Sequence, residues 1–425
     1  MAAQPAGLIP EDWQTEIYPQ AQTQTEQLLQ LFDQPTLTKL IEDTLAANYD
    51  LQQTAIRLKQ QTRLITQANA ARRPQINLNL NSQRQKEESI NNQHQIGLNL
   101  SWELDLWGRL ADNSDAEQAN LLALEAEFQA ARNSLAARVV QSWIAISMRD
   151  QIILAQRAWV SSLQKTESVI TERYSRGLGA LADLEVARAA TARARAQLAA
   201  TKQEQHQAYH QLALLRGVST TDQLLQPSKL PEVAPVAAVL PIEAISRRHD
   251  IQAAYRAVVS ADASASAAYK QLLPSFEIST DLSQSNNTLS DLLSGSAAWQ
   301  LLGQLTAPLF NGGRLRAAAD IAQLESEKRY LAYQQTLLTA IHEVETALGQ
   351  ESSLAIQEQQ VRIALQHSKN SLIHYQDRYS NGLSDILDLL SAKQSAFDAQ
   401  IQLFQIRQSR LINRIELGLA LGMGV

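Results

Sequence analysis

The feature that most constrains this chain is the length of its stretches without glycine or proline. Residues 110–176 contain neither, which is a run of 67 residues, and the run from Arg314 to Asn381 contains only Gly349. These runs are rich in Ala, Leu, Gln, Glu and Arg, which are strong helix formers. A helix of that length extends about 100 Å, whereas an ordinary helix has roughly 11–12 residues. Such helices cannot fold into one globule, so the sequence predicts that they pack side by side.

Four shorter runs predict the remaining helices. Glycine (15) and proline (11) are scarce in the 425 residues, at about half of their usual combined frequency. The runs are Thr36–Arg73, Ala180–Arg216, Ile242–Leu273 and Leu383–Leu417.

The chain also repeats itself. Residues 173–188 align with residues 378–393, and 8 of the 16 positions are identical at an offset of 205. Several shorter matches keep this order, which indicates two copies of one unit. We predict an N-terminal extended segment (1–35), a first repeat (36–217), a Pro-rich equatorial linker (218–240) and a second repeat (241–425), because prolines interrupt regular structure in the linker.

Each repeat contains two segments in which apolar and polar residues alternate, as in a β-strand with two different faces. The two predicted β-hairpins cover about residues 75–106 and 275–309. Long polar connections are expected at Arg84–His94 and Ser283–Ala298. The apolar members are Ile76, Leu78 and Leu80; Ile96, Leu98, Leu100, Trp102, Leu104 and Leu106; Phe276, Ile278 and Leu282; and Trp299, Leu301, Gly303, Leu305, Ala307 and Leu309.

These strands have roughly the 9–11 residues of a transmembrane β-strand. An ordinary antiparallel sheet with one solvated face is the alternative, but Asn, Asp and Glu on the polar face are poor strand formers in such a sheet. Four strands cannot close a barrel, since the smallest membrane barrels have about 8 and open edges are excluded from lipid. A polar inner face favours a barrel with a lumen, hence three copies and 12 strands. The predicted fold is mainly α, a long-helix α-barrel with four β-strands per protomer.

Composition excludes several other classes of protein. The net charge is −6, which opposes a nucleic-acid binder. The chain has no cysteine, so disulfides, thiol nucleophiles and thiolate metal sites are excluded. His342 and Glu343 do not belong to the two-histidine zinc motif, because no second histidine follows at its spacing. We expect no enzyme activity, no cofactor and no metal site.

The first residues, from Met1 to Gln4, lack the basic start and apolar core of a signal peptide. This leaves two readings: a cytoplasmic protein, or a mature chain with a replaced start.

The order of elements, with the segments Trp102–Arg109 and Leu309–Arg314, resembles the TolC-like outer-membrane efflux proteins. Arg247–Ile251 is similar to that family's Arg-Pro-Asp-[Leu/Ile] element, with His249 in place of proline. The resemblance extends from about residue 36 to the end and is nearest to the multidrug-efflux outer-membrane lipoproteins. That branch usually starts at a lipidated cysteine, which is absent here.

The resemblance implies a trimeric channel-tunnel in the outer membrane of a Gram-negative bacterium, with its helical part in the periplasm. It implies a passive exit duct for drug efflux or secretion. The implied partners are two further copies, outer-membrane lipid, a periplasmic membrane-fusion adaptor and an inner-membrane drug efflux pump, and no nucleic acid. Two alternatives are a soluble coiled-coil scaffold, which the strands oppose, and a secreted helical pore-forming toxin, which the duplication opposes.

The repeated turns at Gly177 and Gly382 are the expected tips of the helices, far from the strands. The resemblance implies that the tips surround a closed mouth. The implied gate and constriction residues are Asp385, Leu387, Asp388 and Ser391, and the implied lock of the closed state is Asp183 with Tyr379. Ser384 occupies a position where some members have a basic partner. An alternative role for Asp183 and Asp385 is capping of helix N-termini.

Overall fold

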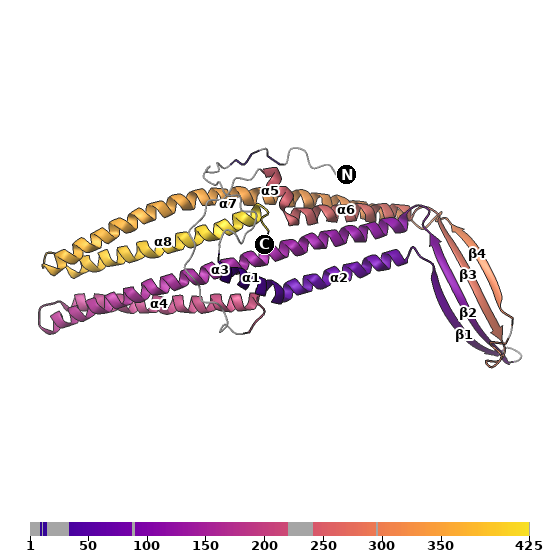
Figure 1. The fold of residues 1–425 in the computed structure, drawn as a ribbon, viewed down its shortest axis with the longest axis horizontal. Helices are drawn as coiled ribbons and strands as arrows, with labels where there is room; N and C mark the ends of the chain where they lie inside the picture. The colour runs from indigo at the N-terminus through magenta and orange to yellow at the C-terminus, as the bar shows by residue number, and fades with distance from the viewer. Residues whose placement is uncertain are drawn as a thin grey trace. The chain divides into compact units, whose positions relative to one another are not determined.

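The computed structural model describes residues 9–10, 12–14, 34–86, 90–219, 241–294 and 296–424. It contains α1 (Pro35–Ala47), α2 (Tyr49–Ala70), β1 (Gln75–Lys86), β2 (Ile90–Leu104), α3 (Arg109–Ser175), α4 (Leu181–Leu215), α5 (Pro241–Arg247), α6 (His249–Lys270), β3 (Ser275–Asn286), β4 (Ala298–Thr306), α7 (Arg314–Ser380) and α8 (Ile386–Ala420), labelled in Figure 1. Most of the expected N-terminal segment and residues 220–240 of the expected linker lie outside the described residues.

The chain forms two compact units. The turn unit comprises Met1–Gln53, Gln129–Arg248 and Leu337–Val425, and the sheet unit comprises Thr54–Phe128 and His249–Thr336. The long helices α3 and α7 contribute to both units.

The internal repeat is confirmed by the lengths of its elements. Helices α3 and α7 have 67 residues each, α4 and α8 have 35 each, and α2 and α6 have 22 each. Strands β1 and β3 have 12 residues each. No described helix is both long enough and apolar enough to cross a bilayer.

The first helix of each repeat is broken, where the sequence predicts one continuous helix. Asn48 separates α1 from α2: its Oδ1 accepts a hydrogen bond from the Leu51 backbone N–H at 2.9 Å, and its Nδ2 donates to the Leu215 carbonyl at 2.7 Å. Arg248 separates α5 from α6 and donates to the Ala420 carbonyl at 3.2 Å. Each break residue therefore binds a carbonyl at the end of the last helix of its own repeat. Propensity could not predict these breaks, because their partners lie far away in the sequence.

The strands form one antiparallel sheet in the order β1-β2-β3-β4. The first two strands extend further than the sequence predicts. The sequence predicts a loop from Arg84 to His94, but β1 continues to Lys86 and β2 already begins at Ile90. Alternation fades there, yet the backbone ladder continues and satisfies the N–H and C=O groups. At the other end, β4 stops at Thr306, so Ala307 and Leu309 lie beyond the strand.

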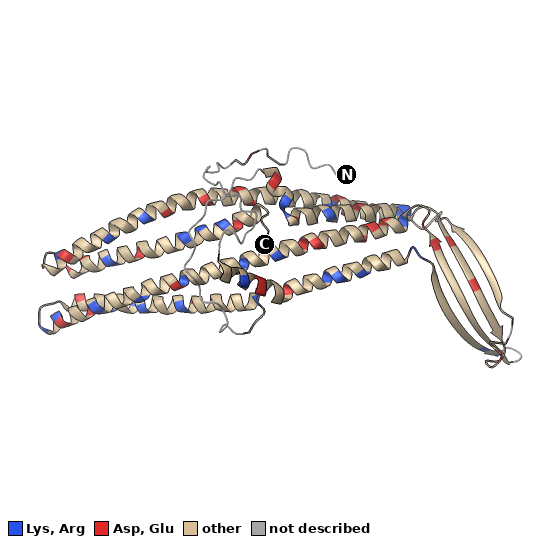
Figure 2. Cartoon of the chain, viewed as in Figure 1, with Lys and Arg blue, Asp and Glu red and all other residues tan. Residues whose placement is uncertain are grey.

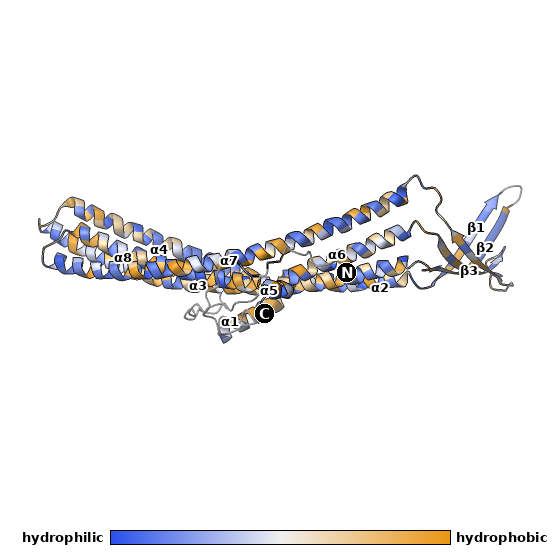
Figure 3. Ribbon diagram, turned by 90° about the horizontal axis from the view of Figure 1, so that it is seen from above, coloured by the Kyte–Doolittle hydropathy of each residue, from blue (hydrophilic) through white to orange (hydrophobic). Residues whose placement is uncertain are grey.

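The register sorts the side chains onto two faces across all four strands, as predicted. Ile76, Leu100, Thr280 and Leu301 form one row, and the next row on that face is Leu78, Leu98, Leu282 and Trp299. The intervening row, on the opposite face, is Asn77, Asn99, Asp281 and Gln300. Figure 3 accordingly shows hydrophobic and hydrophilic residues interleaved along the strands. Strands β1 and β4 are the edges of this sheet.

Below the sheet, polar contacts connect neighbouring helices of the sheet unit. The Gln61 side chain of α2 donates to the Glu117 carbonyl of α3 at 3.0 Å, and the Ser260 hydroxyl of α6 donates to the Ala116 carbonyl at 2.9 Å. The Ser326 hydroxyl of α7 donates to Asp262 of α6.

In the turn unit, three apolar clusters hold the helices together. The first joins α1, α3, α4 and α8 around Ile41, Ile144 and Ile415, which are fully buried. The second joins α3, α4 and α8 nearer the turns, around Leu163, Leu184 and Leu389. The third joins α5, α7 and α8. Alanines are frequent in all three clusters, which lets these helices pack closely.

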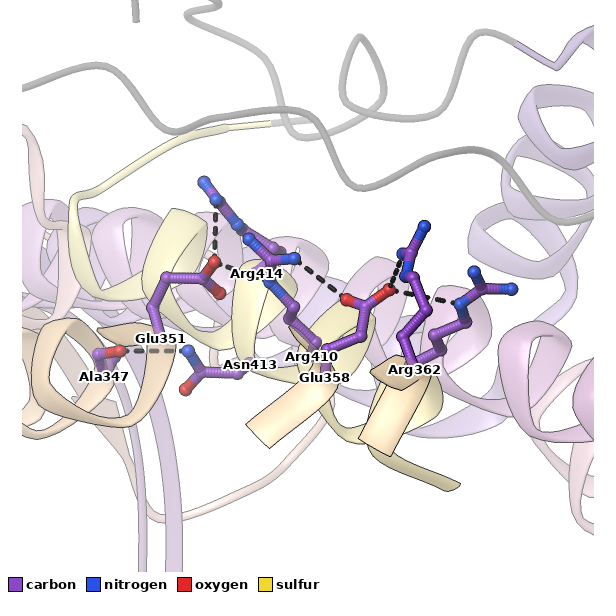
Figure 4. A network of polar contacts seen from close by, with 8 residues as sticks. Ala347, Glu351, Glu358, Arg362, Arg410, Asn413 and Arg414 are labelled. Carbon is purple, nitrogen blue, oxygen red and sulfur yellow. Dashed lines mark hydrogen bonds and ion pairs between the residues drawn. The ribbon is translucent and has the colours of Figure 1, made fainter. Parts of the chain in front are cut away.

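An ionic network links α7 to α8 in the turn unit (Figure 4). Glu358 accepts from Arg362 at 2.7 Å, from Arg407 at 3.2 Å and from Arg410 at 2.9 Å, and its side chain is only 7% exposed. Burial by itself raises the pKa of the Glu358 carboxyl, but the hydrogen bonds from the three arginines outweigh it and hold that pKa below its usual value. The network is therefore ionised at neutral pH and aligns the two helices.

Candidate gate at the helix turns

The two tip glycines end the long helices in the same way. Gly177 and Gly382 have φ angles of 71° and 72°, a left-handed conformation that costs glycine little. The backbone N–H of Leu178 donates to the Arg173 carbonyl at 2.8 Å, and that of Leu383 donates to the Arg378 carbonyl at 2.8 Å. This pattern closes a helix C-terminus, and it turns the chain back sharply into α4 and α8.

The two repeats meet at the side chains of Arg173 and Tyr379. Arg173 Nη1 donates to Tyr379 Oη at 3.3 Å, and the guanidinium carbon lies 6.0 Å from the centre of the tyrosine ring. Both residues line a small pocket of about 100 Å³ together with Asp183, Ser384 and Asp385. The structure thus brings both residues of the expected lock to one pocket, but the hydroxyl of Tyr379 binds Arg173 and not Asp183 in this chain.

The aspartates at the starts of α4 and α8 make no capping hydrogen bonds. The N-cap residue of α4 is Ala180, and Asp183 lies in the first turn. Asp385 is the N-cap residue of α8, yet its side chain makes no cap hydrogen bond. In the described part of the chain, the half-buried Asp183 carboxylate also has no hydrogen bond or ion pair, so it is free to accept one.

The expected constriction residues lie on the exposed side of α8. Asp385, Leu387, Asp388 and Ser391 are exposed, whereas Ile386, Leu389 and Leu390 are buried in the second apolar cluster. Leu387 and Asp388 lie one helical turn from Ser391, so the three share one face. That face points away from the core of the turn unit and is available to line a passage.

Lys393, two residues beyond Ser391, crosses from α8 to α3. Its Nζ donates to the hydroxyls of Ser162 and Thr166 at 3.2 and 2.9 Å. Burial lowers the pKa of this ammonium group, because a desolvated charge is disfavoured. Lys393 is a second polar link between the two repeats near the turns.

Sequence reasoning missed both Arg173 and Lys393. A signal for Arg173 was present, since it is the repeat equivalent of Arg378 and precedes the same Tyr-Ser pair. No local signal marks Lys393, because its partners are two ordinary hydroxyls on another helix. In the residues that the structure describes, no group of three or more His, Asp or Glu side chains could hold a metal ion.

Comparison with known proteins agrees with this architecture. The family model described as outer membrane efflux protein matches residues 40–218 and 240–423. The outer membrane protein OprJ of Pseudomonas aeruginosa is 29% identical over 405 residues, covering 91% of this chain and 84% of OprJ. The probable outer membrane lipoprotein SilC of Salmonella typhimurium is 27% identical over 400 residues, covering 92% of this chain and 87% of SilC.

Solved structures give the same result. A membrane protein from Pseudomonas aeruginosa superposes with a TM-score of 0.92 at 27% identity, covering 99% of both chains. A crystal structure of CusC superposes with a TM-score of 0.90 at 26% identity, covering 99% of this chain and 98% of CusC. The fold, the sheet and the matched stretches all lead to one conclusion: this chain belongs to the outer membrane efflux protein family.

Proposed function

We propose that this outer-membrane efflux channel is gated at the α3–α4 and α7–α8 turns, with the contact between Arg173 and Tyr379 as part of the lock. As a family member, the protein is a trimeric duct rather than an enzyme, with its helical part in the periplasm. It works with a periplasmic adaptor and an inner-membrane pump. Three copies of the sheet close the 12-stranded barrel.

The main observation in support of the gate is the contact between Arg173 and Tyr379, which joins the two repeats. The hydrogen bond from Arg173 to Tyr379 joins α3 to α7 at the tips, where each helix pair ends in an exposed turn. Moving one pair away from the other requires this bond to break. Asp183, in the same pocket, offers an alternative acceptor for either side chain.

Asp388 is proposed to act differently, as the charge at the constriction. Its exposed carboxylate and those of its symmetry mates would form a ring, which favours cations over anions in a narrow pore. Leu387 and Ser391 would complete the same face.

The proposed repeat boundaries stay at 36–217 and 241–425. The two stretches that match the family model, 40–218 and 240–423, support a join within residues 218–240.

We infer that the pump selects the cargo. Relatives named as a cation efflux system protein and as a toluene efflux pump protein match at 27% and 25% identity, which fits a duct with little selectivity of its own.

Conductance in planar bilayers tests the gate. Tyr379→Phe removes the hydroxyl that accepts from Arg173 and keeps the ring packing, so the resting conductance should rise. Tyr375→Phe is the matched control, because Tyr375 lies one turn earlier on α7 and packs on the same cluster. Equal conductance in the wild type and in Tyr379→Phe would reject the lock, and an equal rise in the control would reject its location.

A further inference from the structure

Basic residues occur on every connection between the sheet and the helices. Arg72 and Arg73 precede β1, Arg109 follows β2, Lys270 precedes β3, and Arg314 with Arg316 follow β4. Figure 2 shows blue segments at the helix ends next to the sheet. We call the six residues the basic collar. All of them belong to the sheet unit.

Two members of the collar are neutralised within the chain. Arg109 pairs with Glu103 at 2.8 Å, and Lys270 pairs with Asp112 at 2.6 Å. A third acidic residue nearby, Asp105, is also occupied: its carboxylate accepts from the backbone N–H groups of Leu110 and Ala111 at the start of α3.

The other four members are exposed arginines without such partners. Arg72, Arg73, Arg314 and Arg316 are all exposed, and none of their guanidinium groups forms an ion pair or hydrogen bond in the part of the chain that the structure describes. Four guanidinium groups per chain, twelve in the trimer, carry positive charge that the chain itself does not neutralise, and they attract anions. The collar therefore favours a negatively charged neighbour.

The position of the collar identifies that neighbour. The apolar face of the sheet ends at the row of Leu104, Phe276 and Leu305, directly before the collar. Two tryptophans lie at this level: Trp102 Nε1 donates to the Arg72 carbonyl at 3.0 Å, and Trp107 Nε1 donates to the Pro274 carbonyl at 2.6 Å. Tryptophan is enriched at the boundary between hydrocarbon and water. The collar thus lies at headgroup depth.

Apolar side chains accompany the charges. Leu309 and Phe310, after β4, are 95% and 93% exposed, and Trp107 is 48% exposed. A pocket of about 290 Å³ lies between the sheet and the helix ends. Its apolar lining includes Leu106, Trp107 and Pro308, and its charged lining consists of Glu103, Asp105, Arg109 and Lys270, all of which already have partners in the chain. Leu309 and Phe310 lie on the same connection, between β4 and α7, as the free Arg314. Apolar groups and free arginines at one level match a molecule with an acyl chain and an anionic headgroup.

We propose that the basic collar binds anionic phospholipid headgroups in the periplasmic leaflet of the outer membrane. The arginines form charge-assisted hydrogen bonds with the phosphate, and Leu309 and Phe310 contact the acyl chains. A bound ring of lipid fixes the height of the barrel in the bilayer.

Native mass spectrometry of the delipidated trimer tests the proposal, with short-chain phosphatidylglycerol compared with phosphatidylcholine of the same chain length. The wild type should retain more phosphatidylglycerol. Each charge removed near an anionic lipid surface should weaken this retention roughly fivefold, so Arg72→Gln/Arg73→Gln and Arg314→Gln/Arg316→Gln should each lose most of it. Phosphatidylcholine binding should stay the same.

Two further variants separate a lipid site from a folding defect. Arg57→Gln/Lys59→Gln removes two charges from α2, about 20 Å before its sheet end, and should keep the preference. Arg72→Lys/Arg73→Lys should also keep much of it, because the charge remains. Equal retention by the wild type and both collar variants, or equal loss in the α2 control, would overturn the proposal. Displacement of the lipid by millimolar inorganic phosphate would do so as well, since it would show a site for phosphate alone.

Discussion

The Arg173 guanidinium donates to the Tyr379 hydroxyl across the two repeats, 206 positions apart in the chain. The two residues end equivalent long helices, so their contact directly joins the tips of the two helix pairs. A neutral acceptor and a charged donor form a stronger bond than two neutral groups, although solvent weakens it at this exposed site.

A double-mutant cycle should show that Arg173 and Tyr379 act through one bond. Arg173→Gln and Tyr379→Phe should each shift the closed–open equilibrium by about 0.2–1 kcal/mol per chain, the usual range for an exposed charged contact. The double variant should match the larger single effect, since both changes break the same link. Single-channel recordings give the open fraction. Additive effects would mean that the two side chains act separately, and Asp183→Ala then becomes the next variant to test.

Asp388→Asn should lower cation selectivity without opening the pore. The substitution removes the charge and keeps the size of the side chain, so the closed population should change little. Reversal potentials under a salt gradient measure the selectivity, and block by multivalent cations should weaken with it. Asp398→Asn, further along α8, serves as the control. Opening of the pore by Asp388→Asn would instead assign this residue to the lock.

Glu358→Gln should destabilise the turn unit, and more so at neutral pH than in acid. The change leaves three arginines facing a neutral group, which in a buried network costs about 3 kcal/mol. Because the pKa of Glu358 is held below its usual value in the folded state, its contribution to stability is present above the unfolded pKa and is lost as the pH falls through the lower, folded pKa. The difference between wild type and variant should therefore shrink below about pH 4.5.

Thermal unfolding followed by circular dichroism at pH 7 and at pH 4 measures this difference. Glu325→Gln is the control, because Glu325 also lies on α7 and also pairs with two basic residues, Lys328 and Arg329, but at an exposed site. Its unfolding temperature should stay close to that of the wild type. A Glu358→Gln deficit that is equally large at both pH values would show that charge is not the cause.

Single cysteines should verify which face of the sheet meets lipid. The chain has no cysteine, so Asn99→Cys and Leu100→Cys can be labelled without background. A membrane-impermeant thiol reagent should label position 99, in the lumen, and leave position 100, in lipid, largely unreacted. The reverse preference would mean that the faces are inverted, as a one-residue shift of register would produce.

Asn48→Ala should loosen the junction between α1 and α2. It removes the acceptor for Leu51 N–H, worth about 1 kcal/mol in a helix cap, and the donor to the Leu215 carbonyl, worth about 1 kcal/mol more. Hydrogen exchange should accelerate at residues 49–52 and at the end of α4. Gln52→Ala, which removes an exposed amide that donates to the Ala46 carbonyl at 3.1 Å, should cause a smaller change.

Local patterns in the sequence determined most of the fold. The scarcity of glycine and proline predicted α3 and α7, alternation predicted all four strands and their two faces, and internal identity predicted the repeat. The first two signals depend on neighbouring residues alone, and the third on a comparison of one half of the chain with the other. Gly177 and Gly382 were identifiable for the same reason, since a helix end with a left-handed glycine is a local feature.

Only the tertiary structure decided what the side chains touch. The resemblance to the efflux proteins implies a lock between Tyr379 and Asp183, and the folded chain adds Arg173, which donates to the same hydroxyl. The sequence predicted a continuous helix through Asn48, but the helix breaks there, where the Leu215 carbonyl at the end of α4 accepts from the Asn48 amide. The partners of Lys393, and two of the three arginines that contact Glu358, lie on other helices, so their positions depend on how those helices align along their length. That alignment arises from packing between distant segments, which no local pattern encodes.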